Sequence, residues 1–400
     1  MTPTAPPLVA PRSAAAAPPP RISIVTPSLD QVEFIGEAIE SVLTQEGRFE
    51  IEYVVMDGGS TDGSVDVIRR YAERVESGRW PVRCCGVTMS WVSARDGGQA
   101  AAINGGFRHA SGDILGYINS DDLYFPGAFQ RVVDVFAADP AADLVHGDGD
   151  VIDRAGARRW EWLSRPYDHA VMTSYHFLWN DFTNYIMQQA TFWRRRVRER
   201  IGELDPTFHF AMDAEYWIRA GASGLRLRHV PAKLGKFRMI EGTKSLSSPT
   251  AFWEDYLEIF RRYRGGRLAD FFGFYYYNLA RARGGDLLRA VADGARVFDC
   301  WRGLGEGERS ALHRHAGRGQ ALAGVLLARD AQRAGGDAEA AALLREALAR
   351  RPALMLRPLT LGILVRRLLG RRGARALDRR VARAILRYRA RRFDYRYAGR

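Results

Sequence analysis

The first half of the chain alternates between two patterns of hydrophobic and polar residues. Short apolar runs, each closed by small polar residues, predict buried strands, and apolar residues at intervals of three and four predict amphipathic helices. The predicted strands are residues 21–28, 51–57, a stretch within 82–92, and 113–119, and the predicted helices are residues 32–45, 64–75 and 98–110. This alternation is typical of βαβ units, so we expect an α/β fold with a mostly parallel sheet and helices on both faces.

The pattern changes after about residue 140. Shorter strands with many aromatic residues are predicted at 144–153 and 158–164, and a helix begins near Met212. We expect this part to be an antiparallel extension of the first sheet. From residue 250 onward the pattern is helical, and residues 336–354 resemble one helix of a tetratricopeptide-type repeat. A second copy at a fixed period is missing from the sequence, so a repeat array is not supported.

Composition narrows the class of protein. The chain has 400 residues, 46% of them hydrophobic, which suits two or three globular domains. Its three cysteines form no disulfide framework and no metal-ligand spacing, and no apolar run is long enough for a membrane-spanning helix. We therefore expect a cytoplasmic protein with a disordered Pro/Ala-rich leader at residues 1–20, an α/β domain at 21–248 and an Arg-rich helical region at 249–400.

Positive charge is concentrated in the C-terminal region. Residues 251–400 contain 32 Arg, no Lys and 15 acidic residues, whereas residues 1–250 contain 27 basic and 31 acidic residues. Residues 354–393 combine apolar helical spacing with dense arginine, a pattern typical of helices on the surface of anionic membranes. Helices that pack on the preceding domain with arginine toward solvent would give the same pattern. Nucleic acid is not an expected partner, because the sequence holds no recognisable nucleic-acid-binding module.

Polar residues follow each predicted strand of the first half at the point where it ends. Ligands bind at the carboxyl ends of parallel strands, so these residues are expected to meet at one edge of the sheet. They are Thr26, Pro27, Ser28, Asp57, Asp96, Asn119, Ser120, Asp121 and Asp122.

Two of these strand ends carry acidic residues in distinctive surroundings. Asp121 and Asp122 suit Mg²⁺ or Mn²⁺, which takes one or two carboxylates together with substrate phosphates, although a turn before a helix is the alternative. Asp57 begins the glycine-rich turn DGGSTDG, whose backbone N–H groups could approach a ligand or simply connect a strand to a helix. The turn is neither a Walker loop nor a GxGxxG dinucleotide fingerprint.

Further candidate residues lie after residue 200. Asp213 falls in the first turn of a predicted helix, on the face of Trp217 and Ala220, where it could be a general base or only stabilise the helix dipole. Four basic residues could contact phosphates or form a solvated loop. They are Lys233, Lys236, Arg238 and Lys244.

Taken in order, these segments resemble the family 2 glycosyltransferases with the GT-A fold, a Rossmann-like architecture. The matching segments are ISIVTPSLDQVEFIGEAIESVLTQ, IEYVVMDGGSTDGS, DGGQAAAINGGFRHASGDILGYINSDDLYFPGAF and QQATFWRRRVRERIGELDPTFHFAMDAEYWIRAG. The resemblance covers about residues 21–245.

The resemblance implies roles for individual residues. Asp213 would be the catalytic base, and a divalent cation (Mn²⁺ or Mg²⁺) would bind Asp121 with Asp122 beside it. The residues that would bind the nucleotide sugar are Thr26, Pro27, Ser28, Asp57, Asp96, Asn119, Ser120, Asp121, Arg238 and Lys244. The acceptor side would be formed by Gln188, Trp193 and Arg194.

Two residues depart from the family pattern. Asn119 replaces the first acid of the Asp-x-Asp motif, where it could still bond a ribose hydroxyl, and Ile240 stands where relatives often carry a His. If that His helps to hold metal or diphosphate, either Arg238 or Lys244 must compensate, or the metal affinity is weaker.

The resemblance implies an inverting hexosyltransferase that moves a sugar from a nucleotide-diphosphate sugar, first of all a UDP-sugar, to a glycan or lipid-linked acceptor. Cell-envelope polysaccharide is the expected pathway, with the enzyme at the inner face of the membrane. A degenerate module that binds nucleotide or glycan without turnover is the alternative. A nucleotidyltransferase is disfavoured, because TPSLDQ follows the first strand where a glycine-rich loop with a basic residue would be expected.

Overall fold

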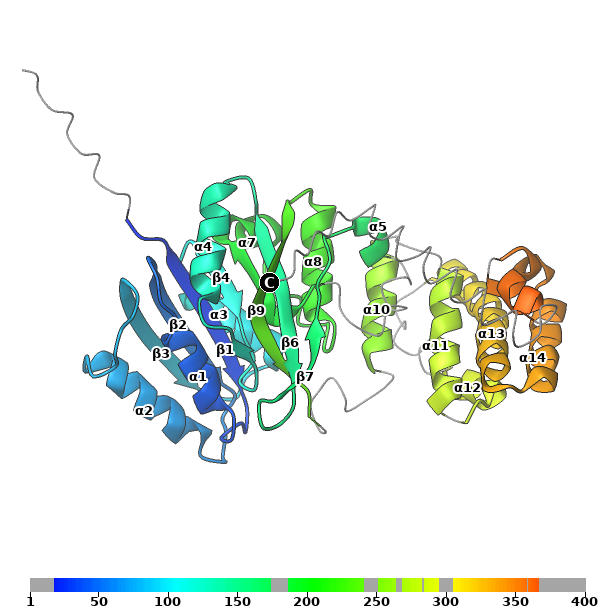
Figure 1. Cartoon of the computed structure of the whole chain (residues 1–400), viewed down its shortest axis with the longest axis horizontal. Coiled ribbons are helices and arrows are strands. Elements are labelled where there is room, and N and C mark those ends of the chain that lie inside the picture. The colour runs from blue at the N-terminus through cyan, green and yellow to red at the C-terminus, as the bar shows by residue number, and fades with distance from the viewer. Residues whose placement is uncertain are drawn as a thin grey trace, which may run out of the picture. The chain divides into compact units, whose positions relative to one another are not determined.

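A computed structural model describes residues 18–173, 186–240, 251–263, 268–282, 284–294, 305–357 and 359–366. The described chain divides into two compact units (Figure 1). The first contains residues 18–169 and 186–240, and the second contains residues 170–173 and those from 251 onward. Three predictions fall outside the described residues: Lys244, positions 1–17 of the leader, and positions 367–393 of the basic tail.

One mixed sheet organises the first unit. Its strands are β1 (Arg21–Ser28), β2 (Glu50–Asp57), β3 (Gly86–Ser93), β4 (Ile114–Tyr117), β5 (Leu123–Tyr124), β6 (Leu144–Ile152), β7 (Arg158–Trp162), β8 (Thr191–Arg194) and β9 (Leu227–Arg238). They lie in the order β3-β2-β1-β4-β8-β6-β9-β5, with β7 paired to β6. The pairs β3–β2, β2–β1 and β1–β4 are parallel, which confirms the predicted α/β fold.

The second half of the sheet only partly follows the prediction. β8 pairs antiparallel with β4 and β6, and β7 pairs antiparallel with β6, as expected. The pattern missed β9, which pairs parallel with β6. Lys233, Lys236 and Arg238 therefore lie on a strand and not in a solvated loop.

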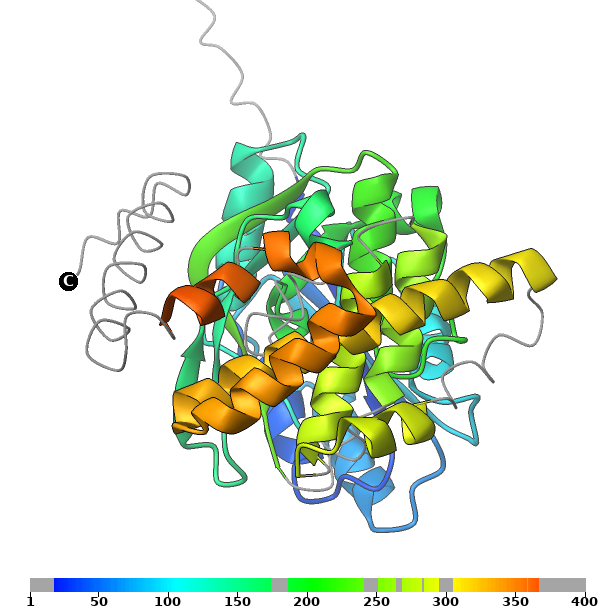
Figure 2. The ribbon, with the colours of Figure 1, turned by 90° about the vertical axis from the view of Figure 1, so that its right-hand side faces the viewer.

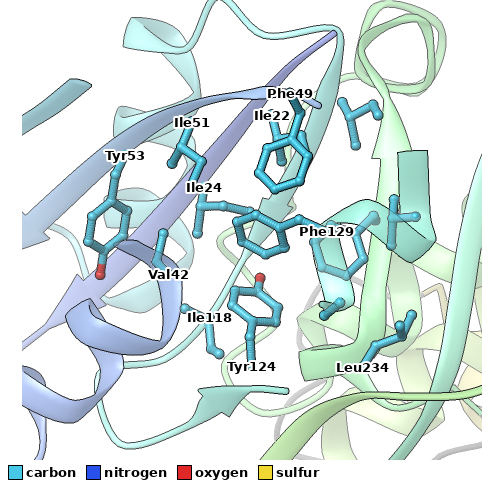
Figure 3. Packing of buried hydrophobic residues seen from close by; sticks show 14 of the residues in the cluster. Ile22, Ile24, Val42, Phe49, Ile51, Tyr53, Ile118, Tyr124, Phe129 and Leu234 are labelled. Atoms are coloured by element: carbon cyan, nitrogen blue, oxygen red, sulfur yellow. The ribbon is translucent and has the colours of Figure 1, made fainter. Parts of the chain in front are cut away.

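Helices cover both faces of the parallel part of the sheet. On one face, Ile24 and Tyr53 belong to a core cluster that also contains Val42 of α1 (Ile35–Leu43) and residues of α2 (Ser64–Glu76) (Figure 3). On the other face, Val25 meets α3 (Gln99–His109) at Gly106, where an added Cβ would lie 2.4 Å from a Val25 methyl carbon. Glycine at this position therefore sets how closely α3 approaches the sheet.

α1 begins later than the predicted start at residue 32, because the loop before it is bound elsewhere. The backbone N–H groups of Asp30, Gln31 and Val32 donate to the side chains of Ser60, Ser64 and Asp62. The loops after β1 and β2 are thereby joined above the carboxyl ends of those strands. The remaining helices of this part are α4 (Ala128–Ala138), η1 (Gln188–Ala190), α7 (Arg195–Ile201) and α8 (Met212–Ala222). α5 (His169–Met172) starts at His169 of the first unit and continues in the second.

The second unit is helical, as predicted. Its elements are α10 (Ala251–Arg262), α11 (Leu268–Ala282), α12 (Leu287–Gly294), α13 (Glu306–Ala334), α14 (Asp337–Arg350) and η3 (Pro352–Leu356). α13 ends at Gly335, whose φ of 93° is a left-handed value that suits glycine, and α14 returns beside α13 (Figure 2). Within the described part of the chain, no helix has both the length and the apolar character needed to cross a membrane.

Candidate active site

The carboxyl ends of the first three strands form a row of polar residues. Ser28 of β1 pairs with Asp57 of β2, and Asp57 pairs with Ser93 of β3. The Ser93 hydroxyl donates to Asp57 Oδ2 at 2.6 Å. Parallel pairing thus brings the first two predicted strand ends to one edge, where β3 adds Ser93.

Asp57 is buried and builds the glycine-rich turn that follows it. Its Oδ2 accepts bonds from the backbone N–H groups of Gly59 and Ser60, both at 3.0 Å, and its Oδ1 accepts from the Ser60 hydroxyl at 2.5 Å. Asp96 borders the same turn, because its Oδ2 would lie 3.2 Å from a Cβ placed on Gly58. The two acids therefore line one loop junction.

The two hydroxyl groups at the end of β1, those of Thr26 and Ser28, differ in their surroundings. The Thr26 hydroxyl accepts a bond from the Tyr53 hydroxyl at 2.9 Å and is turned into the core. Pro27 and Ser28 are also buried, and the Ser28 hydroxyl has no hydrogen-bond partner among the described residues. Of these three residues, Ser28 is the one with an unused polar group at the edge of the sheet.

The loop after β4 contains two acids that differ in exposure. Asp121 is half-buried, and burial raises the pKa of its carboxyl, although its own backbone N–H and the charge of Arg238 act in the opposite direction. Asp122 is fully buried, and its pKa is raised well above the ordinary value by burial and then by the neighbouring Asp121. Asp121 is therefore the carboxylate of this pair that a ligand can reach.

Neutral donors from three elements hold Asp122. Its Oδ2 accepts from the side-chain amides of Asn119 at 3.1 Å and Gln189 at 2.7 Å, and its Oδ1 accepts from the backbone N–H of Arg238 at 2.8 Å. Asn119 in turn accepts a bond from the Gln99 amide at 2.7 Å. Each polar atom of Asn119 thus has a partner inside the protein, while one amide N–H and one carbonyl lone pair are left over, so its predicted bond to a ribose hydroxyl stays a prediction.

Arg238 lies inside the protein and supports the loop of Asp121. Its residue is only 1% exposed. Its guanidinium donates to the backbone carbonyls of Asp121 at 2.8 Å and Arg154 at 2.6 Å, and to the Glu37 carboxylate at 2.6 Å. We therefore correct its predicted role: Arg238 fixes backbone around the site and is not placed to contact the donor.

Asp213 lies in the first turn of α8, as predicted. It is half-buried, and its Oδ1 accepts the backbone N–H of Ala214 at 2.8 Å, while Trp217 and Ala220 on the same face are buried. The pKa of buried Tyr117, at the end of β4, is raised by burial first and then by the charges of Asp213 and Asp122. Both acids are therefore close enough to Tyr117 to affect it, which brings α8 and the loop after β4 to the same end of the sheet.

The three residues assigned to the acceptor side lie in three different environments. Gln188 is at the site edge, where its amide donates to the Tyr117 carbonyl at 2.7 Å. Trp193 is 1% exposed and packs against Trp217 with ring centroids 5.4 Å apart, so it belongs to the core. Arg194 pairs in the sheet with Ile114, the first residue of β4, and its guanidinium donates to the Phe136 carbonyl at 2.7 Å. The assignments of Trp193 and Arg194 to the acceptor side are therefore wrong.

The described lysines have partners within the protein. Lys233 contacts Asp150 at 2.8 Å and Glu161 at 3.0 Å, and its pKa is raised chiefly by the bond to Asp150. Lys236 lies over the Phe125 ring, 4.8 Å from the centroid. Lys233 is therefore already paired with two carboxylates, whereas Lys236 contacts an aromatic ring and its predicted contact with phosphate stays a prediction.

The residues present fit a divalent cation that is bound mainly through its substrate. Within the described ranges, no three His, Cys, Asp or Glu side chains gather as a metal site. Asp121 offers one reachable carboxylate, and Mg²⁺ or Mn²⁺ needs only one or two beside phosphate oxygens. Three residues that contact the predicted ones were not themselves predicted from the sequence: Gln99, Tyr117 and Gln189. Of these, only Gln189 had a signal in the sequence, because it is next to the predicted Gln188.

Comparison with known proteins agrees with this arrangement. The family model of Glycosyl transferase family 2 matches residues 23–223. A glycosyltransferase of Mycobacterium tuberculosis, itself uncharacterized, is 32% identical over 203 residues, which are 50% of this chain and 69% of that protein. An uncharacterized glycosyltransferase of Nostoc is 27% identical over 202 residues, 46% of this chain and 54% of that protein.

A third relative is the O-antigen biosynthesis protein of Myxococcus xanthus, 27% identical over 230 residues, which are 57% of this chain and 16% of that protein. The chain thus matches about half of the Nostoc relative and a smaller part of the Myxococcus one. The matched residues include strands β2 to β8, most of β1, the loops that follow these strands, and Asp213, and they end before β9. The chain belongs to glycosyl transferase family 2, as the sequence predicted.

Proposed function

We propose that this protein transfers a sugar from a nucleotide-diphosphate sugar to an acceptor hydroxyl, with inversion at the anomeric carbon. The observation that carries the proposal is that Asp213 and Asp122 both act on the buried Tyr117 at the carboxyl end of β4, which puts the first turn of α8 and the loop of Asp121 at the same end of the sheet. A base for the acceptor hydroxyl and a separate carboxylate for a cation on the leaving diphosphate are what a single in-line displacement requires.

The chemistry assigns one task to each acid. Asp213 takes the proton of the acceptor hydroxyl while that oxygen forms the new bond to the anomeric carbon and the bond to the diphosphate breaks. A divalent cation at Asp121 would neutralise charge on the leaving diphosphate. Asp57, Asp96 and Ser28 would line the nucleoside pocket, where the buried Ser28 hydroxyl has no hydrogen-bond partner among the described residues.

A UDP-sugar is the first donor to test, and a glycan or lipid-linked acceptor of the cell envelope is the first acceptor class. The name of the Myxococcus relative, an O-antigen biosynthesis protein, supports an envelope polysaccharide. The nucleotide can be found by thermal denaturation of the protein with UDP, GDP, dTDP or CDP, each with Mn²⁺, Mg²⁺ or EDTA. A nucleotide at a hundredfold excess over its Kd adds about 2.7 kcal/mol of stability.

The expected result is stabilisation by one nucleotide that requires the metal. Stabilisation that persists in EDTA would remove the metal from the proposal. No stabilisation by any nucleotide would contradict the donor site and favour a degenerate module.

We also propose that the second unit contacts an anionic membrane from the cytoplasmic side. Leu356 is 82% exposed, and Met355, Leu361 and Val365 are also exposed, at the start of the Arg-rich segment 354–393. Co-sedimentation with vesicles should show binding to phosphatidylglycerol-containing membranes and little binding to phosphatidylcholine. Leu356→Asp should weaken it, whereas Leu163→Asp, an exposed leucine of the first unit, should not. Equal loss in both variants would contradict this surface.

A further inference from the structure

Five residues form one connected set of hydrogen bonds below the candidate metal loop. We call it the Asp122 network: Gln99, Asn119, Asp122, Gln189 and Arg238. Its members come from α3, the loop after β4, η1 and the end of β9. Every bond within it is between 2.7 and 3.1 Å.

The donors and acceptors of the network permit only an amide at position 119. The Asp122 carboxylate accepts, so the atom of Asn119 that faces it must be the NH₂ group. The carbonyl of the same amide then accepts from Gln99. A carboxylate at 119 would keep the second bond but would lose the N–H that Asp122 accepts, and it would place two acidic oxygens about 3.1 Å apart, which either repel or must share a proton.

The network ends on the backbone of the candidate metal ligand. The residue after Asp121 is Asp122, whose side chain is fixed by three donors. The backbone carbonyl of Asp121 itself accepts from Arg238 Nε at 2.8 Å. The backbone of Asp121 is thereby fixed in two ways: through its own carbonyl oxygen and through the side chain of the next residue, Asp122. Partners of this kind orient the ligand that they support.

We propose that Asn119 and Asp122 are positioning residues: together they hold Asp121 for a divalent cation, and Asn119 must remain an amide because Asp122 faces it. This inference rests on the proposed function, since it assumes that Asp121 binds a cation.

The test is Mn²⁺ affinity of the full-length protein, measured by electron paramagnetic resonance of free Mn²⁺, alone and with UDP. Asn119→Asp should weaken Mn²⁺ binding by about 10- to 100-fold, the usual cost of losing a ligand's supporting partner. Asp122→Asn should weaken it similarly. The double variant Asn119→Asp/Asp122→Asn restores one donor facing one acceptor between these two residues, but its new N–H group also faces the Gln189 amide N–H, so only partial recovery of the affinity is expected.

Asn104→Asp is the matched control. Asn104 is another buried amide, bonded on both sides to the backbone of Leu204 at 2.8 and 3.0 Å. This variant should lower Tm while Mn²⁺ affinity stays within about twofold, because it touches no residue of the network. A fall in Mn²⁺ affinity as large as that of Asn119→Asp would overturn the proposal, since it would reflect general destabilisation.

The other outcomes are equally decisive. Unchanged or tighter Mn²⁺ binding in Asn119→Asp overturns the inference. If Asn119→Asp does not fold, Gln99→Ala at the half-buried start of α3 serves instead, with a several-fold weakening expected and unchanged affinity overturning the proposal. If the wild-type protein binds no Mn²⁺, either alone or with UDP, the metal-assisted function and the inference are both refuted.

Discussion

Acidic side chains at the two edges of the sheet have different kinds of partners. At the amino edge, acids pair with arginine: Glu50 with Arg21 at 2.8 Å, and Asp139 with Arg228 at 2.7 Å. At the carboxyl edge, Asp57 and Asp122 accept bonds from backbone N–H groups, hydroxyls and amides. The acids named at the amino edge are thus paired with arginine, whereas Asp57 and Asp122 at the carboxyl edge are held by neutral donors, although Glu37 at that edge pairs with Arg238.

The pKa directions follow the same division. The bond to Arg228 lowers the pKa of Asp139, whereas burial raises the pKa of Asp121 and Asp122. Raised pKa values mean that the ionised acids at the carboxyl edge are held at a cost to stability. A cation that arrives with substrate would offset that cost, which is the physical basis of the proposed site.

The largest expected effect is at the candidate base. Asp213→Asn should lower kcat by about 10²- to 10⁴-fold, because general-base assistance contributes that much. Nucleotide binding should persist, since the base does not touch the nucleotide. Asp66→Asn, which changes an exposed acid in the first turn of α2, is the control and should keep normal kcat. Near-normal turnover in Asp213→Asn would refute the base assignment.

The next effect is on the pH dependence of stability and comes from His146, which lies in the interior of the sheet between the two edges. Burial and then the neighbouring His229 lower the pKa of His146 on β6 from 6.5 to about 3. The unfolded chain therefore binds a proton that the folded chain excludes, and stability should fall as pH drops from 6.5 toward 3, by up to about 1.4 kcal/mol per pH unit.

His146→Leu should flatten this part of the stability profile measured by urea denaturation at several pH values. His209→Leu, at an exposed position, should leave the slope in place. An unchanged slope in His146→Leu would show that other groups cause the acid sensitivity.

The smallest expected effect is at the amino edge. The Arg228 side chain is 50% exposed, so Arg228→Gln should change the free energy of unfolding by less than about 1 kcal/mol. Metal-dependent nucleotide binding should be unaffected. A large loss of binding would mean that the two edges are not independent.

Sequence reasoning located the parts of the site that follow from parallel strands. Asp57 and Asp121 were predicted because each follows an apolar strand, and Asp213 because it begins an amphipathic helix. Arg194 was misplaced because β8 runs antiparallel to β4: between Gln188 and Arg194 the chain crosses from the carboxyl edge to the amino edge. Short separation in sequence therefore did not mean proximity in space.

The support of the site could not be predicted in the same way. Asn119 is joined to Gln99, twenty residues away, and Asp122 is joined to Gln189, 67 residues away. Such pairs depend on how α3 and η1 pack on the sheet, which no local pattern encodes. Arg238 looked like a phosphate ligand because of its charge, but its burial makes it a support for backbone carbonyls.

The central claim is that the carboxyl edge, and not the amino edge, binds a nucleotide through a divalent cation. Isothermal titration of the nucleotide in Mn²⁺ tests it most directly when Asp121→Asn is compared with Asp143→Asn, whose wild-type carboxylate pairs with Arg196 at 2.7 Å at the amino edge. We predict that Asp121→Asn abolishes the metal-dependent binding and that Asp143→Asn lowers Tm while binding normally. Normal metal-dependent binding by Asp121→Asn would contradict the account.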